Sequence, residues 1–267
     1  MKQALTIAGS DSGGGAGIQA DLKTMHAHGV FGTSVVTAIT AQNTVAVTQA
    51  YELPLDLIRA QLEAVFDDFD IAAIKTGMLS SSDIVATIAD ALSERQVEVL
   101  VVDPVMISKS GHKLLDDEAV ETLRRRLLPM AMLVTPNLHE AELLAGISIT
   151  SVDHMKEAAE RIRQYGCRNV LVKGGHAEFD RATDVLFDGD GFELFEGEFV
   201  HTKNLHGTGC TYSAAITARL ALGEPLAQAI GHAKTYISRA IAASLDIGKG
   251  HGPTHHFYFL TPDDYSR

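Results

Sequence analysis

The sequence predicts an α/β fold in three layers, with a mostly parallel central sheet and helices on both of its faces. Two observations predict it. Short runs rich in β-branched residues alternate with longer amphipathic runs through most of the 267 residues, which is the rhythm of β-α-β units. The expected strands are also continuously apolar instead of alternating, which indicates that both faces of the sheet are buried.

The first half of the chain carries four expected strands and three expected helices. The strands are ALTIAG at 4–9, TSVVTAIT at 33–40, IAAIKTG at 71–77 and VEVLVVDP at 97–104. The helices run over 18–28, 55–66 and 83–93. Each apolar run is followed by an amphipathic one, so parallel pairing with helical crossovers is the expected topology.

The same rhythm continues with a helical run at 116–127, AMLVTPN at 131–137, helices at 138–145 and 152–165, and NVLVKGG at 169–175. In the last of these helices Met155, Ala158, Ala159 and Ile162 share one face, which predicts that it packs on the core. After residue 183 the pattern changes to two strands about the turn DGDG, which predicts a small antiparallel hairpin. Helical runs at 211–222 and 225–245 complete one expected domain over 1–267.

Charge and composition exclude several classes of protein. The chain has 34 acidic and 22 basic residues and a net charge of −12, which argues against a general nucleic-acid binder. No apolar run approaches the roughly 18 residues of a membrane span. Two cysteines without CxxC spacing give no disulfide framework and no zinc site, so we expect a protein of the reducing cytoplasm without a membrane partner.

Ligands of open parallel sheets bind beyond the carboxyl ends of the strands, so the segments that follow the strands are candidate site segments. They are GSDSGGGAG, TAQNT, KTGM, DPVMISKSG, TPNLHEAE and KGGH, and HGTGC follows the hairpin. The glycine-rich stretch 10–17 lacks both the GK[ST] ending of a P-loop and the GxGxxG fingerprint. It is either a wall close to a small ligand or a tight turn capped by Asp11 or Ser12.

Asp103, Asn137 and Glu140 follow two of the expected strands. Their oxygens are the hard ligands that Mg²⁺ prefers, although a turn residue, a helix cap and its capping partner would carry the same side chains. Lys173 ends the strand VLV and suits a phosphate contact or a lysine that extends to solvent. Lys234 lies in the middle of the last expected helix, so the pattern alone indicates a side chain on the solvent-exposed face of that helix.

Cys210 stands at the start of an expected helix, after Gly207 and Gly209. The field of a helix N-terminus favours the thiolate, so we expect a lowered pKa and a reactive group. The alternative is a small residue chosen for packing.

Together these motifs resemble, in order and spacing, the hydroxymethylpyrimidine/phosphomethylpyrimidine kinases of thiamine biosynthesis, and the resemblance runs from residue 4 to about residue 257. It implies a ribokinase-like fold, often assembled as a homodimer. It also implies that ATP and Mg²⁺ are used to phosphorylate 4-amino-5-hydroxymethyl-2-methylpyrimidine and then its monophosphate.

The resemblance assigns roles to individual residues. Gln42 matches the side chain that hydrogen-bonds the pyrimidine, and Gly9, Asp21, Met78 and Val105 match the lining of the same pocket. Lys173, Lys234 and Asn137 match the ATP side, Asp103 and Glu140 the magnesium side, and Gly207, Thr208 and Gly209 the anion hole. Cys210 takes the position of the general base of related sugar kinases, so we expect Cys210→Ser to slow the first phosphorylation more than the second.

Three alternatives stay open at this point. A related branch of pyridoxal kinases shares GSD, KTGM, DPVM and TPN, although TAQNT and the threonine of HGTGC favour the pyrimidine kinases. A non-catalytic pyrimidine sensor would have no reason to keep Lys173, Glu140 and Cys210. A dinucleotide-dependent oxidoreductase would need a glycine fingerprint that this chain lacks. Whether the loop from Ile107 to Lys113 closes over the site is also open.

Overall fold

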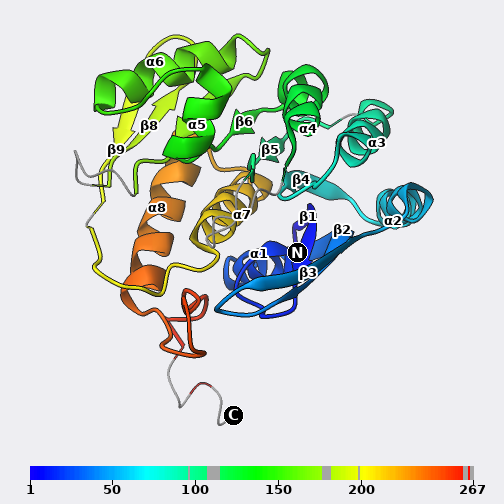
Figure 1. Cartoon of the computed structure of the whole chain (residues 1–267), viewed down its shortest axis with the longest axis horizontal. Coiled ribbons are helices and arrows are strands. Elements are labelled where there is room, and N and C mark those ends of the chain that lie inside the picture. The colour runs from blue at the N-terminus through cyan, green and yellow to red at the C-terminus, as the bar shows by residue number, and fades with distance from the viewer. Residues whose placement is uncertain (96, 107–114, 176–181, 198, 261–263, 265–267) are drawn as a thin grey trace.

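The apolar runs pair into one sheet of mixed direction. In the computed structural model, which describes residues 1–95, 97–106, 115–175, 182–197, 199–260 and 264, nine strands lie in the order β3-β2-β1-β4-β5-β6-β7-β8-β9 (Figure 1). These strands are β1 (Gln3–Asp11), β2 (Phe31–Gln42), β3 (Val47–Glu52), β4 (Ile71–Thr76), β5 (Leu100–Val102), β6 (Leu133–Val134), β7 (Asn169–Val172), β8 (Asp184–Phe187) and β9 (Phe192–Phe195). The six strands from β2 to β7 along this order are parallel, and β3, β8 and β9 run antiparallel to their neighbours.

Helices cover both faces of the sheet. They are α1 (Gly17–Ala27), α2 (Leu55–Asp68), α3 (Ser82–Ser93), α4 (Asp117–Thr122), α5 (Leu138–Ala145), α6 (Val152–Arg163), α7 (Thr208–Ala221) and α8 (Leu226–Ala242). Leu100 and Val102 of β5 pack in one apolar cluster with α2, α3, α5 and α6, whereas Val101 packs in another with α7 and α8. The three predicted layers, the mostly parallel sheet and the small antiparallel hairpin are therefore confirmed.

The elements deviate from the predictions in three places. β3 was not predicted, because its residues are mostly exposed and lack an apolar run. The predicted helix at 116–127 is an α-helix only to Thr122, and a π-helical turn follows over Leu123–Leu127. Helix α7 begins at Thr208, so Cys210 lies inside its first turn and not before it.

The topology decides where a site can form. Six parallel strands end at the same edge of the sheet, and the loops after them converge there with the N-terminal ends of α5 and α7. No helix within the described ranges is long and apolar enough to cross a membrane.

Candidate active site

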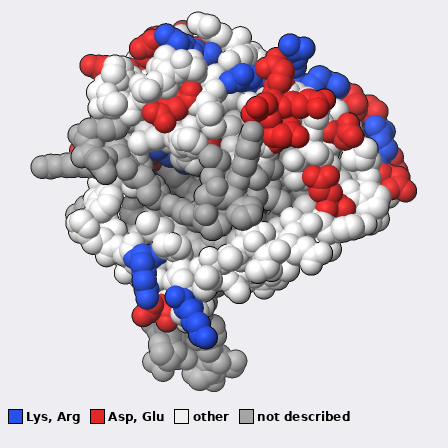
Figure 2. Space-filling view, in the orientation of Figure 1, with Lys and Arg blue, Asp and Glu red and all other residues white. Residues whose placement is uncertain are grey.

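A cleft of about 1740 Å³ opens at the carboxyl edge of the sheet. It extends from the ends of β1 and β2 to the segments after β6 and β7. On the face drawn in Figure 2, acidic side chains gather on the side of α3 and α4, away from the hollow of the cleft. Three lysines, Lys75, Lys173 and Lys234, belong to its lining, and each is paired with a buried aspartate, so the ammonium groups are held in fixed places within a chain of negative net charge.

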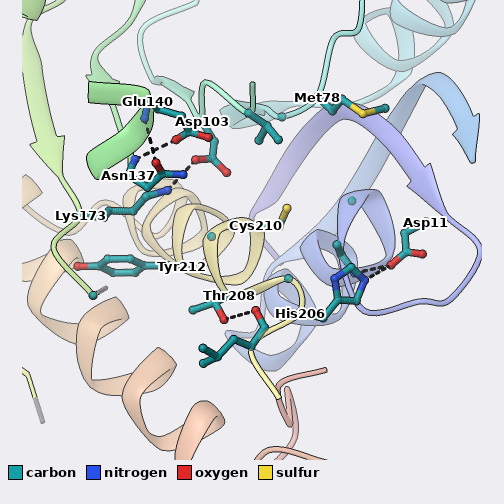
Figure 3. Close-up of a pocket in the computed structure, with 18 of the residues that line it drawn as sticks. Asp11, Met78, Asp103, Asn137, Glu140, Lys173, His206, Thr208, Cys210 and Tyr212 are labelled. Carbon is teal, nitrogen blue, oxygen red and sulfur yellow. Dashed lines mark hydrogen bonds and ion pairs between the residues drawn. The ribbon is translucent and has the colours of Figure 1, made fainter. Parts of the chain in front are cut away.

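Nearly all residues predicted for the site line this cleft. They are Gly9, Gln42, Met78, Asp103, Val105, Asn137, Glu140, Lys173, Gly207, Thr208, Gly209, Cys210 and Lys234 (Figure 3). The sheet order thus brings together side chains that lie more than 200 residues apart in the sequence.

Asp21 is the exception, and its predicted place in the lining of the pocket is wrong. Its carboxylate is fully buried behind the cleft, where Oδ2 accepts hydrogen bonds from Thr6 Oγ1 at 2.6 Å and from Lys75 Nζ at 3.0 Å. Thr6 and Lys75 are register partners in β1 and β4, so both point at α1 from the same face of the sheet. Burial would lower the pKa of Lys75, but the Asp21 carboxylate holds it above its usual value.

The middle of the cleft is built on Asp103 and Lys173. Lys173 Nζ donates to Asp103 Oδ1 at 2.8 Å, Thr135 Oγ1 donates to the same oxygen, and Ser213 Oγ of α7 donates to Oδ2 at 3.1 Å. Burial would raise the pKa of Asp103, but the ammonium groups of Lys173 and Lys75 keep it below its usual value. Both Asp103 oxygens are therefore engaged within the protein.

Asn137 and Glu140 start helix α5 with a reciprocal capping box. Asn137 Oδ1 accepts from the Glu140 N–H at 3.0 Å, and Glu140 Oε2 accepts from the Asn137 N–H at 2.9 Å. Their capping roles are thus real, and both side chains also line the cleft. Burial raises the pKa of Glu140 to about 7, although Lys173 opposes the shift.

This raised pKa predicts that Glu140 makes the stability of the folded protein depend on pH. The folded protein holds the Glu140 proton between pH 4.5 and 7, where the unfolded chain releases it, so wild-type stability falls across this window by up to about 3 kcal/mol. Glu140→Gln keeps an acceptor but never ionises. In metal-free urea unfolding we expect the free energy of unfolding of the variant to increase relative to that of the wild type as pH rises from 4.5 to 7. The same pH dependence of stability in both proteins would contradict the raised pKa.

The residues fit a magnesium ion only in part. Among the residues the structure describes, no three His, Cys, Asp or Glu side chains are grouped to hold a metal ion. Glu140 offers a buried carboxylate, and its raised pKa indicates that Lys173 alone does not compensate for the burial of its negative charge. Asp103 is already paired with Lys173. Mg²⁺ favours carboxylate oxygens together with water and phosphate oxygens, so a bound polyphosphate would have to complete the site.

The first turn of α7 forms the other wall. Its N-cap is Gly207, in the left-handed region at φ +76°, and no side chain caps it. A Cβ at Gly207 would collide with the Gly15 carbonyl oxygen. The backbone N–H groups of such a first turn have no partner within the helix and attract anions. Lys173 Nζ lies 3.6 Å from where a Cβ of Gly209 would be, so an ammonium group faces the same turn.

Gly207→Ala should destabilise the protein by more than about 2 kcal/mol, because left-handed strain and the collision with Gly15 add. Gly223, after α7, is the matched control: it has φ +88°, but nothing lies within 4 Å of its virtual Cβ. Gly223→Ala should lose only the strain, about 1 kcal/mol. Urea unfolding measures both, and equal losses would show that the close packing of Gly207 on Gly15 does not matter.

Cys210 differs from its sequence-based prediction in charge. Burial raises the pKa of the thiol to about 12, although Lys75 and the Gly17 N–H that faces the sulfur act to lower it. The predicted lowering is therefore wrong, because desolvation within the protein outweighs the field of the helix start. In this state the thiol is uncharged near neutral pH.

The end of the cleft at β1 and β2 is partly apolar. A Cβ at Gly9 would collide with Met78 Cε, so glycine is required for Met78 to lie there. Gln42 and Val105 complete the lining, and Ser12 Oγ fixes the Gln42 backbone by donating to its carbonyl at 2.7 Å.

The glycine-rich stretch combines both predicted interpretations. Gly9 and residues 10, 11, 16 and 17 line the cleft, and Asp11 also caps the turn by accepting from the N–H groups of Gly13 and Ala16, each at 2.8 Å. At the opposite end, Lys234 Nζ donates to Asp184 Oδ2 at 2.7 Å and to the Ala182 carbonyl. Lys234 thus faces the cleft instead of solvent.

Sequence reasoning missed Lys75, Asp184, His206 and Tyr212, all of which line the cleft. Lys75 and His206 belong to the motifs KTGM and HGTGC, two residues and one residue before a cleft glycine, so their position in these motifs was an available signal. The predicted loop from Ile107 to Lys113, Lys109 included, lies outside the described residues.

Comparisons with known proteins agree with this geometry. A family model described as phosphomethylpyrimidine kinase matches residues 11–255. A hydroxymethylpyrimidine/phosphomethylpyrimidine kinase from Haemophilus influenzae is 50% identical over 264 residues, covering 97% of this chain and 98% of that protein.

Two solved structures share the fold. The phosphomethylpyrimidine kinase of Clostridium difficile 630 has a TM-score of 0.81 at 48% identity, covering 90% of this chain and 100% of that one. An ADP complex of Bacillus subtilis pyridoxal kinase has a TM-score of 0.91 at 42% identity, covering 97% and 98%. The ribokinase-like architecture is thereby confirmed, and the chain belongs to the phosphomethylpyrimidine kinase family.

Proposed function

We propose that this chain transfers the γ-phosphoryl group of ATP to the hydroxymethyl group of 4-amino-5-hydroxymethyl-2-methylpyrimidine, and then phosphorylates the monophosphate to the diphosphate, in thiamine biosynthesis. The observation that carries the proposal is the position of the α7 N-terminus. It lies beside Lys173 in the middle of the cleft, between an end lined by Gly9, Gln42 and Met78 and an end that contains Lys234.

The chemistry follows from this arrangement. Phosphoryl transfer requires alignment of the acceptor oxygen with the γ-phosphorus and neutralisation of charge on the equatorial oxygens. The N–H groups of the first turn of α7, after Gly207, together with the Lys173 ammonium provide both in the middle of the cleft. Mg²⁺, held by Glu140 and the Asp103 side of the cleft, would neutralise phosphate charge. Lys234 and Asn137 would contact the nucleotide.

Cys210 stands where the acceptor hydroxyl would meet the first turn of α7. Because its thiol is uncharged, we assign it the role of a hydrogen-bonding partner that orients the hydroxyl, instead of a base that removes the proton beforehand. A loose transition state tolerates this, since positioning and charge stabilisation supply most of the rate.

We therefore expect Cys210→Ser to slow both phosphorylations by similar factors, each within about tenfold, because the serine hydroxyl can still orient the acceptor. This revises the asymmetry that a thiolate would produce. Single-turnover reactions followed by mass spectrometry measure the two steps separately, with Cys167→Ser, whose thiol is buried in the core, as the control. A first step slowed far more than the second would restore Cys210 as a base.

A pyridoxal kinase is the second candidate, because the fold matches the Bacillus subtilis pyridoxal kinase so closely. The two functions are separated by kcat/KM for the aminopyrimidine and for pyridoxal, measured with ATP and Mg²⁺. Preference for the pyrimidine supports the proposal; preference for pyridoxal would reassign the chain to vitamin B6 salvage.

The proposal also includes the state of the protein in the cell. We propose one domain, because every described strand belongs to one sheet, and a homodimer located in the cytoplasm, where Cys167 and Cys210 stay reduced. Light scattering of the purified protein tests the dimer.

A further inference from the structure

Asp11, Gln42 and His206 meet at the end of the cleft formed by β1 and β2, and they come from three separate parts of the chain. His206 Nε2 lies 2.8 Å from Asp11 Oδ2 and 3.4 Å from the Gln42 amide nitrogen. Figure 3 draws the contact between His206 and Asp11 as a dashed line. The side chains of His206 and Asp11 are only 10% and 3% exposed. Water therefore competes little for these contacts.

Asp11 determines which ring nitrogen of His206 carries a hydrogen. Its Oδ2 also accepts from the N–H groups of Gly15 at 3.0 Å and Ala16 at 2.8 Å. Burial would raise the pKa of Asp11, but His206 and the N–H groups of Ala16 and Gly13 hold it below its usual value. An ionised carboxylate only accepts hydrogen bonds, so His206 Nε2 must be a donor.

The Gln42 amide can take two orientations, and its neighbours favour one of them. Its other terminal atom lies 3.2 Å from Thr40 Oγ1, whose hydrogen is already donated to the Ser10 carbonyl at 2.9 Å. With the amide nitrogen toward His206, two donors meet there and two acceptors meet at Thr40. With the oxygen toward His206 and the nitrogen toward Thr40, the Gln42 oxygen shares the single Nε2 hydrogen with Asp11 at the longer distance of 3.4 Å, and the Thr40 hydroxyl oxygen accepts from the amide, so no two like groups meet.

We propose that His206, held by Asp11, is a specificity-determining residue that fixes this second orientation of the Gln42 amide and thereby selects the heterocycle that the cleft accepts. It acts through Gln42 and is a positioning residue. The inference rests on the proposed function and adds the origin of its substrate selectivity.

A fixed amide presents its remaining N–H and its remaining lone pair to the cleft in one order. The complementary ligand has a ring nitrogen that accepts and a neighbouring exocyclic amino group that donates, which is the edge of a 4-aminopyrimidine. Rings of the pyridoxal type carry no amino group beside the ring nitrogen. An amide free to rotate would present either order and discriminate less.

The test compares two acceptors, 4-amino-5-hydroxymethyl-2-methylpyrimidine and the same pyrimidine without its 4-amino group. For the wild type we expect kcat/KM to favour the amino compound at least about 100-fold. His206→Phe keeps a ring but removes the donor and should reduce this ratio at least about tenfold, with kcat/KM for the desamino compound little changed. His206→Gln, which returns an N–H near the position of Nε2, should restore most of the ratio.

A double-mutant cycle with Gln42→Leu keeps the test decisive if His206→Phe also lowers stability. In the Gln42→Leu background, His206→Phe should leave the ratio unchanged. If His206→Phe lowers kcat/KM for both acceptors equally, its role is only structural and the inference is overturned while the proposed function stands. A wild type that phosphorylates neither acceptor would overturn the proposed function itself.

Discussion

Lys173→Met should lower kcat/KM for phosphorylation of the pyrimidine about 10³-fold, which is the size of effect seen when one preorganised transition-state donor is removed. Lys173 Nζ lies beside the first turn of α7 and is only 11% exposed, so water cannot replace it easily. Because the charge matters most as the phosphoryl group moves, the loss should appear mainly in kcat. Steady-state kinetics with saturating ATP measures it.

Two controls separate this role from a structural one. Lys234→Met removes another cleft ammonium, which Asp184 and the Ala182 carbonyl hold at one end of the cleft and not beside the first turn of α7, so it should mainly raise the KM for ATP. Asp103→Asn combined with Lys173→Met removes the unpaired carboxylate and should recover stability without recovering kcat. A Lys173→Met enzyme within about tenfold of the wild type would exclude Lys173 as the phosphate contact.

Lys75→Met should destabilise the protein by about 3–5 kcal/mol, since it leaves the Asp21 carboxylate buried without its cation. Both side chains are 0% exposed, and Asp21 Oδ1 has no hydrogen-bond partner among the described residues, so the hydrogen bond from Thr6 Oγ1 to Oδ2 would be left alone to stabilise the carboxylate. Urea unfolding at pH 7 measures the loss.

The double variant Asp21→Asn, Lys75→Met removes both charges and keeps similar volumes. It should recover at least half of the stability lost in Lys75→Met, because a neutral pair carries no desolvation penalty for ions. A free energy of unfolding of Lys75→Met within about 1 kcal/mol of the wild type would contradict the predicted penalty for leaving Asp21 buried without Lys75.

The order of the elements could be predicted from the sequence because each buried parallel strand corresponds to an uninterrupted apolar run. β3 was not predicted because it is an exposed strand that pairs only with β2, and its own residues form no apolar run. The last part of the predicted helix at 116–127 forms a π-helical turn instead of an α-helix. Such a turn depends on packing against the neighbouring elements, which the sequence pattern does not show.

The candidate site was predicted with similar limits. The rule that ligands bind at strand ends found Asp103 and Lys173, because each follows an apolar strand directly. The resemblance placed Asp21 in the lining of the pocket, and it could not show that Asp21 turns away from the cleft, since that depends on Lys75 in another strand. Nor could the sequence predict the pKa of Cys210, because a helix start is visible in a sequence but the burial around one thiol is not.

The measurement that tests the proposed function most directly is an assay of the purified chain with ATP, Mg²⁺ and 4-amino-5-hydroxymethyl-2-methylpyrimidine, with products followed by mass over time. We expect the monophosphate to rise first and the diphosphate to follow from it, with both absent in Lys173→Met over the same period. Absence of any pyrimidine phosphate from the wild type, or preferential conversion of pyridoxal to a single monophosphate, would contradict the proposed function.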